Sequence, residues 1–161
     1  MYISGLENFS DANGDGFRTV LYVSGCSHHC NGCQNPETWN PKNGVEYDEE
    51  IQNKILDMLS NKYISGLTLT GGDPLYESNL NSVLELLNKF RILFNNTKTV
   101  WLYSGYTFDK AIKNEKRKQI IELCDIMVDG RFESDKKNLL LKFRGSSNQR
   151  LVDIEKKRRN L

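Results

Sequence analysis

Short apolar runs rich in β-branched and aromatic residues alternate along this chain with longer segments whose apolar residues recur at helical spacing. Runs of the first kind predict strands, and segments of the second kind predict helices. The expected strands cover residues 17–23, 67–70, 99–103 and 125–128, with two further short ones over 139–143 and 151–154. The expected helices cover residues 48–61, 78–94 and 110–123. This alternation restricts the chain to folds built from strand–helix–strand units.

A strand–helix–strand unit places its two strands parallel in one sheet. We therefore predict an α/β fold with an open, mostly parallel sheet of about five strands. The chain has 161 residues, which is the size of one domain, and no internal repeat or flexible linker divides it. Residues 1–161 are accordingly expected to form a single domain.

Each of the four main predicted strands is followed by a loop of unusual sequence. The first strand leads into a run of cysteines at 26–33, and the second leads into Gly71-Gly72-Asp73-Pro74. Ser104-Gly105-Tyr106 follows the third strand, and Asp129-Gly130-Arg131 follows the fourth. Parallel α/β sheets bind ligands at the carboxyl ends of their strands, where such loops gather. We therefore expect these four loops to form one site.

The charge balance and the apolar pattern limit the partners of this protein. Its 22 basic and 21 acidic residues leave a net charge of +1, which provides no overall field to attract nucleic acid. No apolar run approaches the roughly 18 residues that a membrane span requires, and the N-terminus lacks the pattern of a secretion signal. We therefore expect a cytoplasmic protein that binds neither nucleic acid nor membranes.

Three of the four cysteines, Cys26, Cys30 and Cys33, lie close together with the spacing C-x3-C-x2-C. In a reducing compartment such a cluster is typical of metal ligands or catalytic thiols rather than of disulfides. Iron–sulfur cubanes are usually held by four cysteines, so three thiolates would leave one iron open to another ligand. Cys124 lies far away among apolar residues and is expected to be a buried residue of the core.

Zinc is the alternative to an iron–sulfur cluster at this loop, with His28, His29 or Cys124 as the fourth ligand. Zinc sites usually pair C-x2-4-C with a second pair a dozen or more residues away, and this chain lacks the second pair. A histidine between two ligands of one short loop is also poorly placed to complete a tetrahedron. We therefore favour the iron–sulfur cluster, with both histidines as loop residues beside it. The alternative to an enzyme with an iron–sulfur cluster is a non-catalytic, zinc-binding interaction module.

The C-x3-C-x2-C loop after the first strand and the Gly-Gly-Asp-Pro turn after the second resemble the radical S-adenosylmethionine (SAM) superfamily. Within it, segments 20–26 (VLYVSGC) and 34–39 (QNPETW) are similar to those of glycyl-radical-enzyme activases. Segments 101–106 (WLYSGY), 129–132 (DGRF) and 143–150 (FRGSSNQR) resemble the subfamily that activates anaerobic ribonucleoside-triphosphate reductase. The resemblance implies a partial (β/α) barrel.

One segment departs from the pattern of these activases. They commonly read Asp-Gly-Pro-Gly-x-Arg before the first strand, whereas this chain reads Asn13-Gly14-Asp15-Gly16-Phe17-Arg18. Asp15 thus stands where a rigid proline is usual, which leaves the conformation of this loop open.

The resemblance implies that Cys26, Cys30 and Cys33 are the catalytic ligands of a 4Fe–4S cluster whose fourth iron binds the amine and carboxylate of SAM. One electron from the reduced cluster would cleave SAM into methionine and a 5′-deoxyadenosyl radical. The cofactors supply this chemistry, and the protein supplies orientation. The backbone of Gly32, Cys33 and Gln34 is implied to meet the adenine of SAM.

Further SAM contacts are implied for the loops after the second and third strands. Asp73 would accept a hydrogen bond from the SAM ammonium group, and Gly71-Gly72 would let the main chain approach the methionine part closely. Ser104 would contact the SAM carboxylate or ribose.

The implied protein partners are the large subunit of the anaerobic reductase, whose backbone glycine would lose a hydrogen to the radical, and a one-electron donor such as flavodoxin. The nearest enzymatic alternative is an activase of another glycyl radical enzyme, of the pyruvate formate-lyase type.

Overall fold

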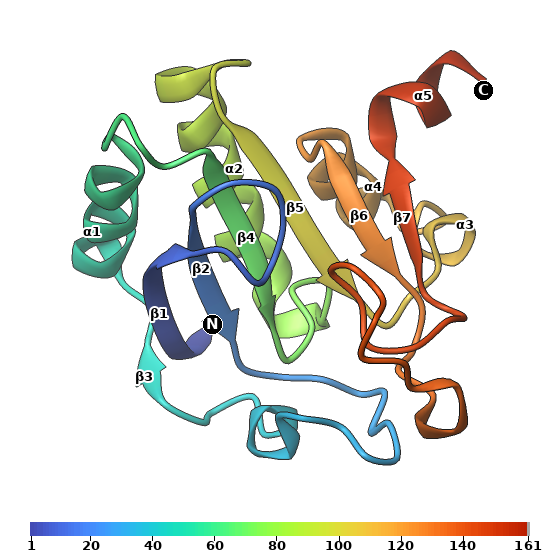
Figure 1. Cartoon of the computed structure of the whole chain (residues 1–161). Helices are drawn as coiled ribbons and strands as arrows, with labels where there is room; N and C mark the ends of the chain where they lie inside the picture. Colours follow the sequence, from blue (N-terminus) through green and yellow to red (C-terminus); the bar gives the residue numbers. More distant parts are fainter. Residues whose placement is uncertain (161) are drawn as a thin grey trace.

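A mixed sheet of seven strands runs through the computed structural model, which describes residues 1–160 (Figure 1). The strands are β1 (Tyr2–Ser10), β2 (Arg18–Val23), β3 (Val45–Glu46), β4 (Gly66–Gly71), β5 (Thr99–Ser104), β6 (Ile126–Asp129) and β7 (Arg150–Asp153). Their order across the sheet is β3-β1-β2-β4-β5-β6-β7. The four central strands β2, β4, β5 and β6 are mutually parallel, so their carboxyl ends share one edge of the sheet. The outer strands β1, β3 and β7 pair antiparallel.

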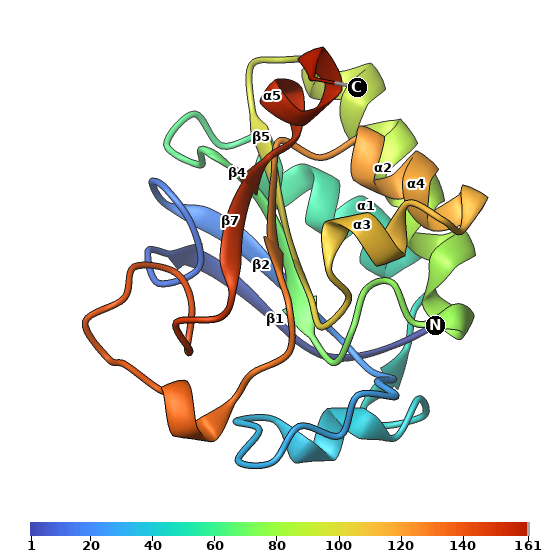
Figure 2. The ribbon, with the colours of Figure 1, turned by 90° about the vertical axis from the view of Figure 1, so that its right-hand side faces the viewer.

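Helices α1 to α4 cover one face of this sheet, and α5 follows β7 at its edge (Figure 2). The helices are α1 (Glu49–Leu59), α2 (Leu80–Phe94), α3 (Phe108–Ala111), α4 (Glu115–Glu122) and α5 (Ile154–Arg159). Short 3-10 turns lie at Pro36–Trp39, Glu77–Asn79 and Ser134–Lys136. Apolar side chains of the central strands and of the helices fill the layer between them, including Leu21, Leu69, Leu102, Ile55, Leu87 and Phe90. No helix within residues 1–160 is both long and apolar enough to cross a membrane.

The second face of the sheet is covered by loops instead of helices. Segments 11–17 and 131–149 lie over it (Figure 2). Because side chains alternate between the two faces of a strand, each central strand also turns residues toward this second face. Tyr22, Thr70 and Tyr103 are three of these residues, and they line a pocket beneath the loops.

Arg18, the first residue of β2, is fully buried on the second face and donates hydrogen bonds to oxygen atoms of several segments. Its Nε donates to Thr68 Oγ1 at 2.8 Å, and Nη1 donates to Thr99 Oγ1 and to the Asp15 carbonyl, both at 3.0 Å. Its Nη2 donates to the carbonyls of Leu67 and Thr99. Burial lowers the pKa of Arg18 to about 10. The guanidinium therefore fixes the loop around Asp15, the position that departs from the activase pattern in the sequence analysis, against β4 and β5.

Replacing Arg18 with lysine is expected to lower the free energy of unfolding by about 1–3 kcal/mol. Lysine carries three donors on one nitrogen and cannot replace the five donors of a guanidinium, so buried acceptors lose their partners. Chemical denaturation measures the effect, with Arg159→Lys on the exposed surface of α5 as the matched control. An unchanged unfolding free energy for Arg18→Lys would contradict this account.

Several expectations from the sequence differ from the structure at the edges of the sheet. Within residues 1–160 the sheet has seven strands rather than about five, and three of its six strand pairs are antiparallel. The expected strand over 139–143 is a loop, because the segment closes on itself through the bridge between Lys137 and Ser146. β7 occupies the free edge of β6 instead. The expected helix over 110–123 is split into α3 and α4, and the Asn114 side chain caps the second of them.

Candidate functional site

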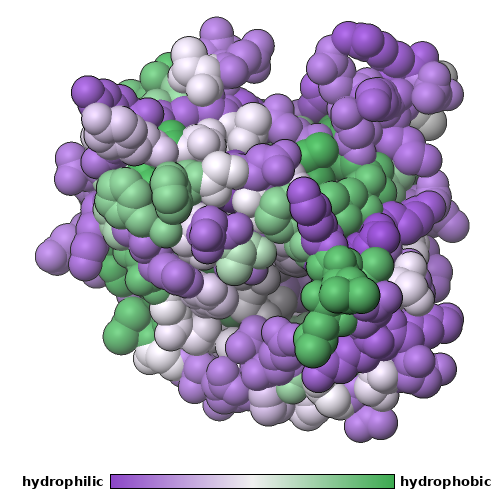
Figure 3. Space-filling view, viewed as in Figure 1, coloured by the Kyte–Doolittle hydropathy of each residue, from purple (hydrophilic) through white to green (hydrophobic). Residues whose placement is uncertain are grey.

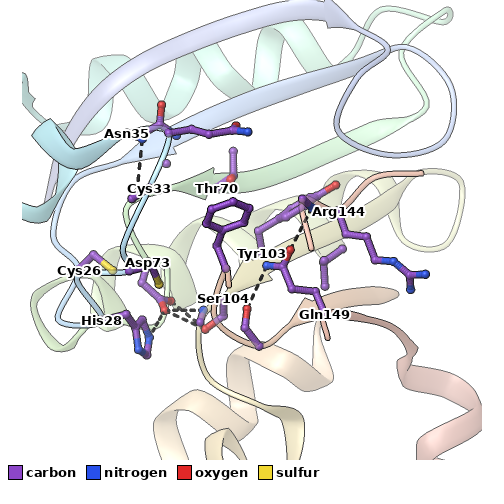
Figure 4. Close-up of a pocket in the computed structure, with 18 of the residues that line it drawn as sticks. Cys26, His28, Cys33, Asn35, Thr70, Asp73, Tyr103, Ser104, Arg144 and Gln149 are labelled. Carbon is purple, nitrogen blue, oxygen red and sulfur yellow. Dashed lines mark hydrogen bonds and ion pairs between the residues drawn. The ribbon is translucent and has the colours of Figure 1, made fainter. Parts of the chain in front are cut away.

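A cavity of about 540 Å³ lies at the carboxyl ends of the four parallel strands (Figure 4). Each of the four loops that the sequence analysis singled out contributes to its walls. These residues are Cys26, Cys30, Cys33 and Gln34 after β2, Gly71, Gly72 and Asp73 at the end of β4, Ser104 and Gly105 at the end of β5, and Gly130 after β6. Gly32 has a positive φ of 75° and does not line the cavity. The structure therefore brings together all but one of the site residues expected from the sequence.

The cysteine loop is held at both ends by backbone hydrogen bonds. The Gly25 amide donates to the Thr38 carbonyl at 2.7 Å, and the Cys33 amide donates to the Cys30 carbonyl at 3.1 Å. The three thiols are free and half-buried. Burial raises the pKa of Cys26 to about 11, although the backbone amides of the two following histidines act in the opposite direction. Binding a metal cluster would therefore have to release the thiol proton.

Cys124 lies away from this loop, in the helical layer. It is 3% exposed and belongs to the hydrophobic core, as its apolar sequence context predicts. Its thiol donates a hydrogen bond to the Ile120 carbonyl at 3.2 Å. Burial raises the pKa of Cys124 strongly, so the thiol stays protonated.

The walls of the cavity carry buried polar atoms that have no hydrogen-bond partner within residues 1–160. These are Trp39 Nε1, the Tyr103 hydroxyl and Arg144 Nε. A buried donor without a partner is costly, and native proteins rarely keep one that nothing satisfies. Together with three free thiols on one wall, these donors fit a cavity that holds a metal cluster and a polar small molecule.

The Asp73 carboxylate connects three of the loops (Figure 4). It is 1% exposed and accepts hydrogen bonds from the Leu75 amide at 2.8 Å, the Ser104 hydroxyl at 2.9 and 3.0 Å, and the Gly105 amide at 3.0 Å. His28 Nε2 lies 2.8 Å from Asp73 Oδ2. The resemblance implied a carboxylate available to the SAM ammonium, but in the structure both oxygens of Asp73 already accept hydrogen bonds from the chain. An ammonium group would have to displace one of these donors.

His28 ties the cysteine loop to the rest of the site, a role for which the sequence gives no direct signal. Arg131 Nε donates to His28 Nδ1 at 3.3 Å, which assigns the ring proton to Nε2 and makes Nε2 the donor to Asp73. The ring packs edge-on against Tyr106 with centroids 4.5 Å apart. A Cβ on Gly105 would lie 2.4 Å from the His28 ring, so only glycine fits there.

His28 also belongs to a group of side chains that could bind a zinc ion in place of an iron–sulfur cluster. Ligand atoms of Cys26, His28 and Asp73 lie within 4.8 Å of one another and could hold a metal ion. This set contains only one of the three clustered cysteines, and its histidine and carboxylate already bond to each other. Metal and sulfide analysis of the purified protein distinguishes the two kinds of site.

Gly71 and Gly72 are required by the close approach of the protein's own backbone. Gly71 has φ of 99°, and a Cβ there would lie 2.7 Å from backbone atoms of Val23. A Cβ on Gly72 would lie 2.6 Å from the Gly25 carbonyl oxygen and 2.9 Å from that of Thr38. The glycine pair therefore lets the end of β4 pack directly against the base of the cysteine loop.

Comparison with known proteins shows the family of this chain. Residues 12–152 match the family described as 4Fe-4S single cluster domain. A protein named anaerobic ribonucleoside-triphosphate reductase-activating protein from Enterobacteria phage T4 is 42% identical over 141 residues, covering 86% of this chain and 85% of the relative. Proteins of the same name from Pasteurella multocida (strain Pm70) and Escherichia coli (strain K12) are 40% and 37% identical over 139 residues, covering 85% of this chain and 87% and 88% of the relatives. The chain therefore belongs to the family of anaerobic ribonucleoside-triphosphate reductase-activating proteins and contains a 4Fe-4S single cluster domain.

Proposed function

We propose that this protein reductively cleaves SAM at a 4Fe–4S cluster held by Cys26, Cys30 and Cys33, and thereby installs a glycyl radical on anaerobic ribonucleoside-triphosphate reductase. The observation that carries the proposal is the placement of three free, half-buried thiols on one wall of the cavity at the carboxyl ends of the parallel strands. The names of the relatives support the reductase as the partner. The four parallel strands with their helices would be the partial (β/α) barrel of a radical SAM enzyme.

When bound, the reduced cluster would supply one electron that breaks a C–S bond of SAM, giving methionine and a 5′-deoxyadenosyl radical that takes hydrogen from a glycine of the reductase. The chain itself would orient SAM and exclude water. The unpartnered Tyr103 hydroxyl, Trp39 Nε1 and Arg144 Nε would donate to SAM or to the incoming peptide. Phe132 and Phe143 also line the cavity and would keep solvent away from a radical.

We also infer a division of labour among the other site residues. Gly71 and Gly72 would present main-chain groups to the methionine part, and Cys33 and Gln34 would meet the adenine. Asp73 and Ser104 would act by fixing three loops relative to one another, since each is hydrogen-bonded within the chain. The electron would come from a small one-electron donor such as flavodoxin.

Anaerobic purification and reconstitution test the function directly. The protein should contain equal amounts of iron and sulfide, and after reduction it should convert SAM to 5′-deoxyadenosine. With the large subunit of an anaerobic ribonucleotide reductase present, electron paramagnetic resonance should record a glycyl doublet.

The two halves of this test can fail separately. SAM cleavage without a glycyl doublet would move the substrate to another glycyl radical enzyme, such as one of the pyruvate formate-lyase type. Purified protein that contains zinc and no sulfide would support the zinc-binding interaction module instead. A reduced iron–sulfur cluster that leaves SAM intact would overturn the enzymatic proposal.

A further inference from the structure

The tip of the loop over residues 137–145, here called the leucine loop, presents apolar side chains to solvent at the rim of the cavity. Leu139 and Leu140 are 86% and 92% exposed, the highest values among the large hydrophobic residues that the structure describes. Leu139, Leu141 and Phe143 of the same loop line the cavity. In Figure 3 an apolar prominence stands beside a hollow on this face, with hydrophilic side chains around it. Exposed apolar groups beside a functional site often mark an interaction surface.

The leucine loop is fixed at its base. The Gln149 side-chain oxygen accepts hydrogen bonds from the amides of Gly145 and Ser146 at 3.0 and 3.1 Å, and its Nε2 donates to the Gly130 carbonyl at 3.0 Å. The ring of Phe143 packs edge-on against Trp101 with centroids 5.1 Å apart. The leucines are therefore held out from an anchored base.

Positive charge surrounds the exposed leucines. Residues 136–152 contain five lysine and arginine residues and no aspartate or glutamate, although the whole chain has a net charge of only +1. Lys136 and Arg150 pair with acidic residues outside this segment. Within residues 1–160, Lys137, Lys142 and Arg144 make no ion pair. The surface next to the cavity thus combines two exposed leucines with three unpaired cations.

We propose that the leucine loop is the docking contact for the reductase, and that it receives an apolar side chain flanked by aspartate or glutamate near the glycine that enters the cavity. This inference rests on the proposed function and adds where the partner binds and with what chemistry. Charge complementarity selects an acidic segment, and continuity with the cavity wall places that segment beside the reacting glycine. A small-molecule substrate bound in the cavity would gain nothing from Leu140, which lies outside the cavity.

Leu140→Ser tests the apolar part of the contact, because Leu140 lies at the loop tip and does not line the cavity. Fluorescence titration of the large reductase subunit should give a Kd at least about tenfold higher than for wild type, as expected when a leucine loses its burial at an interface. The matched control is Ile92→Ser on α2, where the isoleucine is 81% exposed on the opposite side of the sheet. Both variants should keep the wild-type iron content and melting temperature.

Lys142→Glu tests the charge. The Kd for the reductase should rise about three- to tenfold at low salt, and the difference from wild type should shrink as ionic strength increases. Lys54→Glu, on the exposed surface of α1, is the matched control and should bind like wild type.

The outcomes separate this inference from the proposed function. If wild type cleaves SAM and activates the reductase while Leu140→Ser and Lys142→Glu bind normally, the docking assignment alone is wrong. If wild type cleaves SAM but does not bind the reductase, both the partner and its docking site are wrong. A concentration-dependent dimer of the protein alone that Leu140→Ser abolishes would assign the loop to a second copy of this chain and overturn the proposal.

Discussion

Replacing Cys26, Cys30 or Cys33 with alanine is expected to remove the iron–sulfur cluster and with it all cleavage of SAM, while Cys124→Ala should retain both. Each of the first three thiols lies on the same wall of the cavity. With only three cysteines available, the loss of one leaves two, which is too few to hold a cubane. Cys124 belongs to the hydrophobic core and does not line the cavity.

Iron and sulfide content after anaerobic reconstitution measures the first effect, and 5′-deoxyadenosine production measures the second. Cys124→Ala is the matched control because it removes the same thiol group from a different part of the fold. Loss of iron from Cys124→Ala in equal measure would show that the ligands are wrongly assigned. Retention of iron and loss of sulfide in Cys30→Ala would indicate a metal site of another kind, formed by Cys26, His28 and Asp73.

The centre of the fold could be read from the sequence because its strands are short, apolar and separated by clear helical periods. The expected strands over 99–103 and 125–128 match β5 (Thr99–Ser104) and β6 (Ile126–Asp129) to within one residue at each end. Their loops therefore fall at the carboxyl edge that the sequence analysis anticipated. The parallel order of the strands predicted that the three cysteines, Gly71, Gly72 and Ser104 would share one cavity.

The edges of the fold could not be read in the same way. β1 (Tyr2–Ser10) contains glycine and polar residues and is only partly buried, so its sequence lacks the signal of a buried strand. Residues 139–143 carry that signal, with three leucines and a phenylalanine, yet they form part of the leucine loop. Pairing at a sheet edge depends on which segment reaches the edge, and here β7 takes the place beside β6.

The internal connections of the site were also hidden from the sequence. His28 and Asp73 are 45 positions apart, and nothing in either segment indicates that their side chains meet. The close approach that requires Gly72 likewise depends on how the cysteine loop folds back over β4. Residue types and spacing predict which loops converge, whereas the contacts within the site follow from tertiary packing.

Asp73→Asn is expected to weaken SAM binding by about ten- to a hundredfold, the value of a buried hydrogen bond to a charged group. The family resemblance implies a direct contact between Asp73 and the SAM ammonium, which would account for such a loss. The structure points to another cause, because the carboxylate holds His28 of the cysteine loop and Ser104 and Gly105 at the end of β5. An asparagine keeps the shape of the side chain but offers one acceptor oxygen where the carboxylate offers two.

A double-mutant cycle with His28→Phe distinguishes the two causes. Phenylalanine keeps a ring against Tyr106 but loses the hydrogen bonds to Asp73 and Arg131. If Asp73 acts by anchoring the cysteine loop, each single variant cuts the same connection, and the double variant should bind SAM no more weakly than Asp73→Asn. If Asp73 contacts the ammonium directly, the fold-losses of SAM affinity in the two single variants should multiply in the double variant.

We expect the non-additive result, measured by SAM titration of reconstituted protein with matched iron content. His29→Phe is the control, since His29 stacks on Trp39 with ring centroids 4.6 Å apart and has no hydrogen bond to Asp73 in the part of the chain that the structure describes. The spectrum of the reduced cluster gives a second readout: a loosened cysteine loop should alter it before SAM is added, in both Asp73→Asn and His28→Phe. If the two fold-losses of SAM affinity multiply in the double variant and the cluster spectrum is unaltered, Asp73 contacts SAM directly and the anchoring account is wrong.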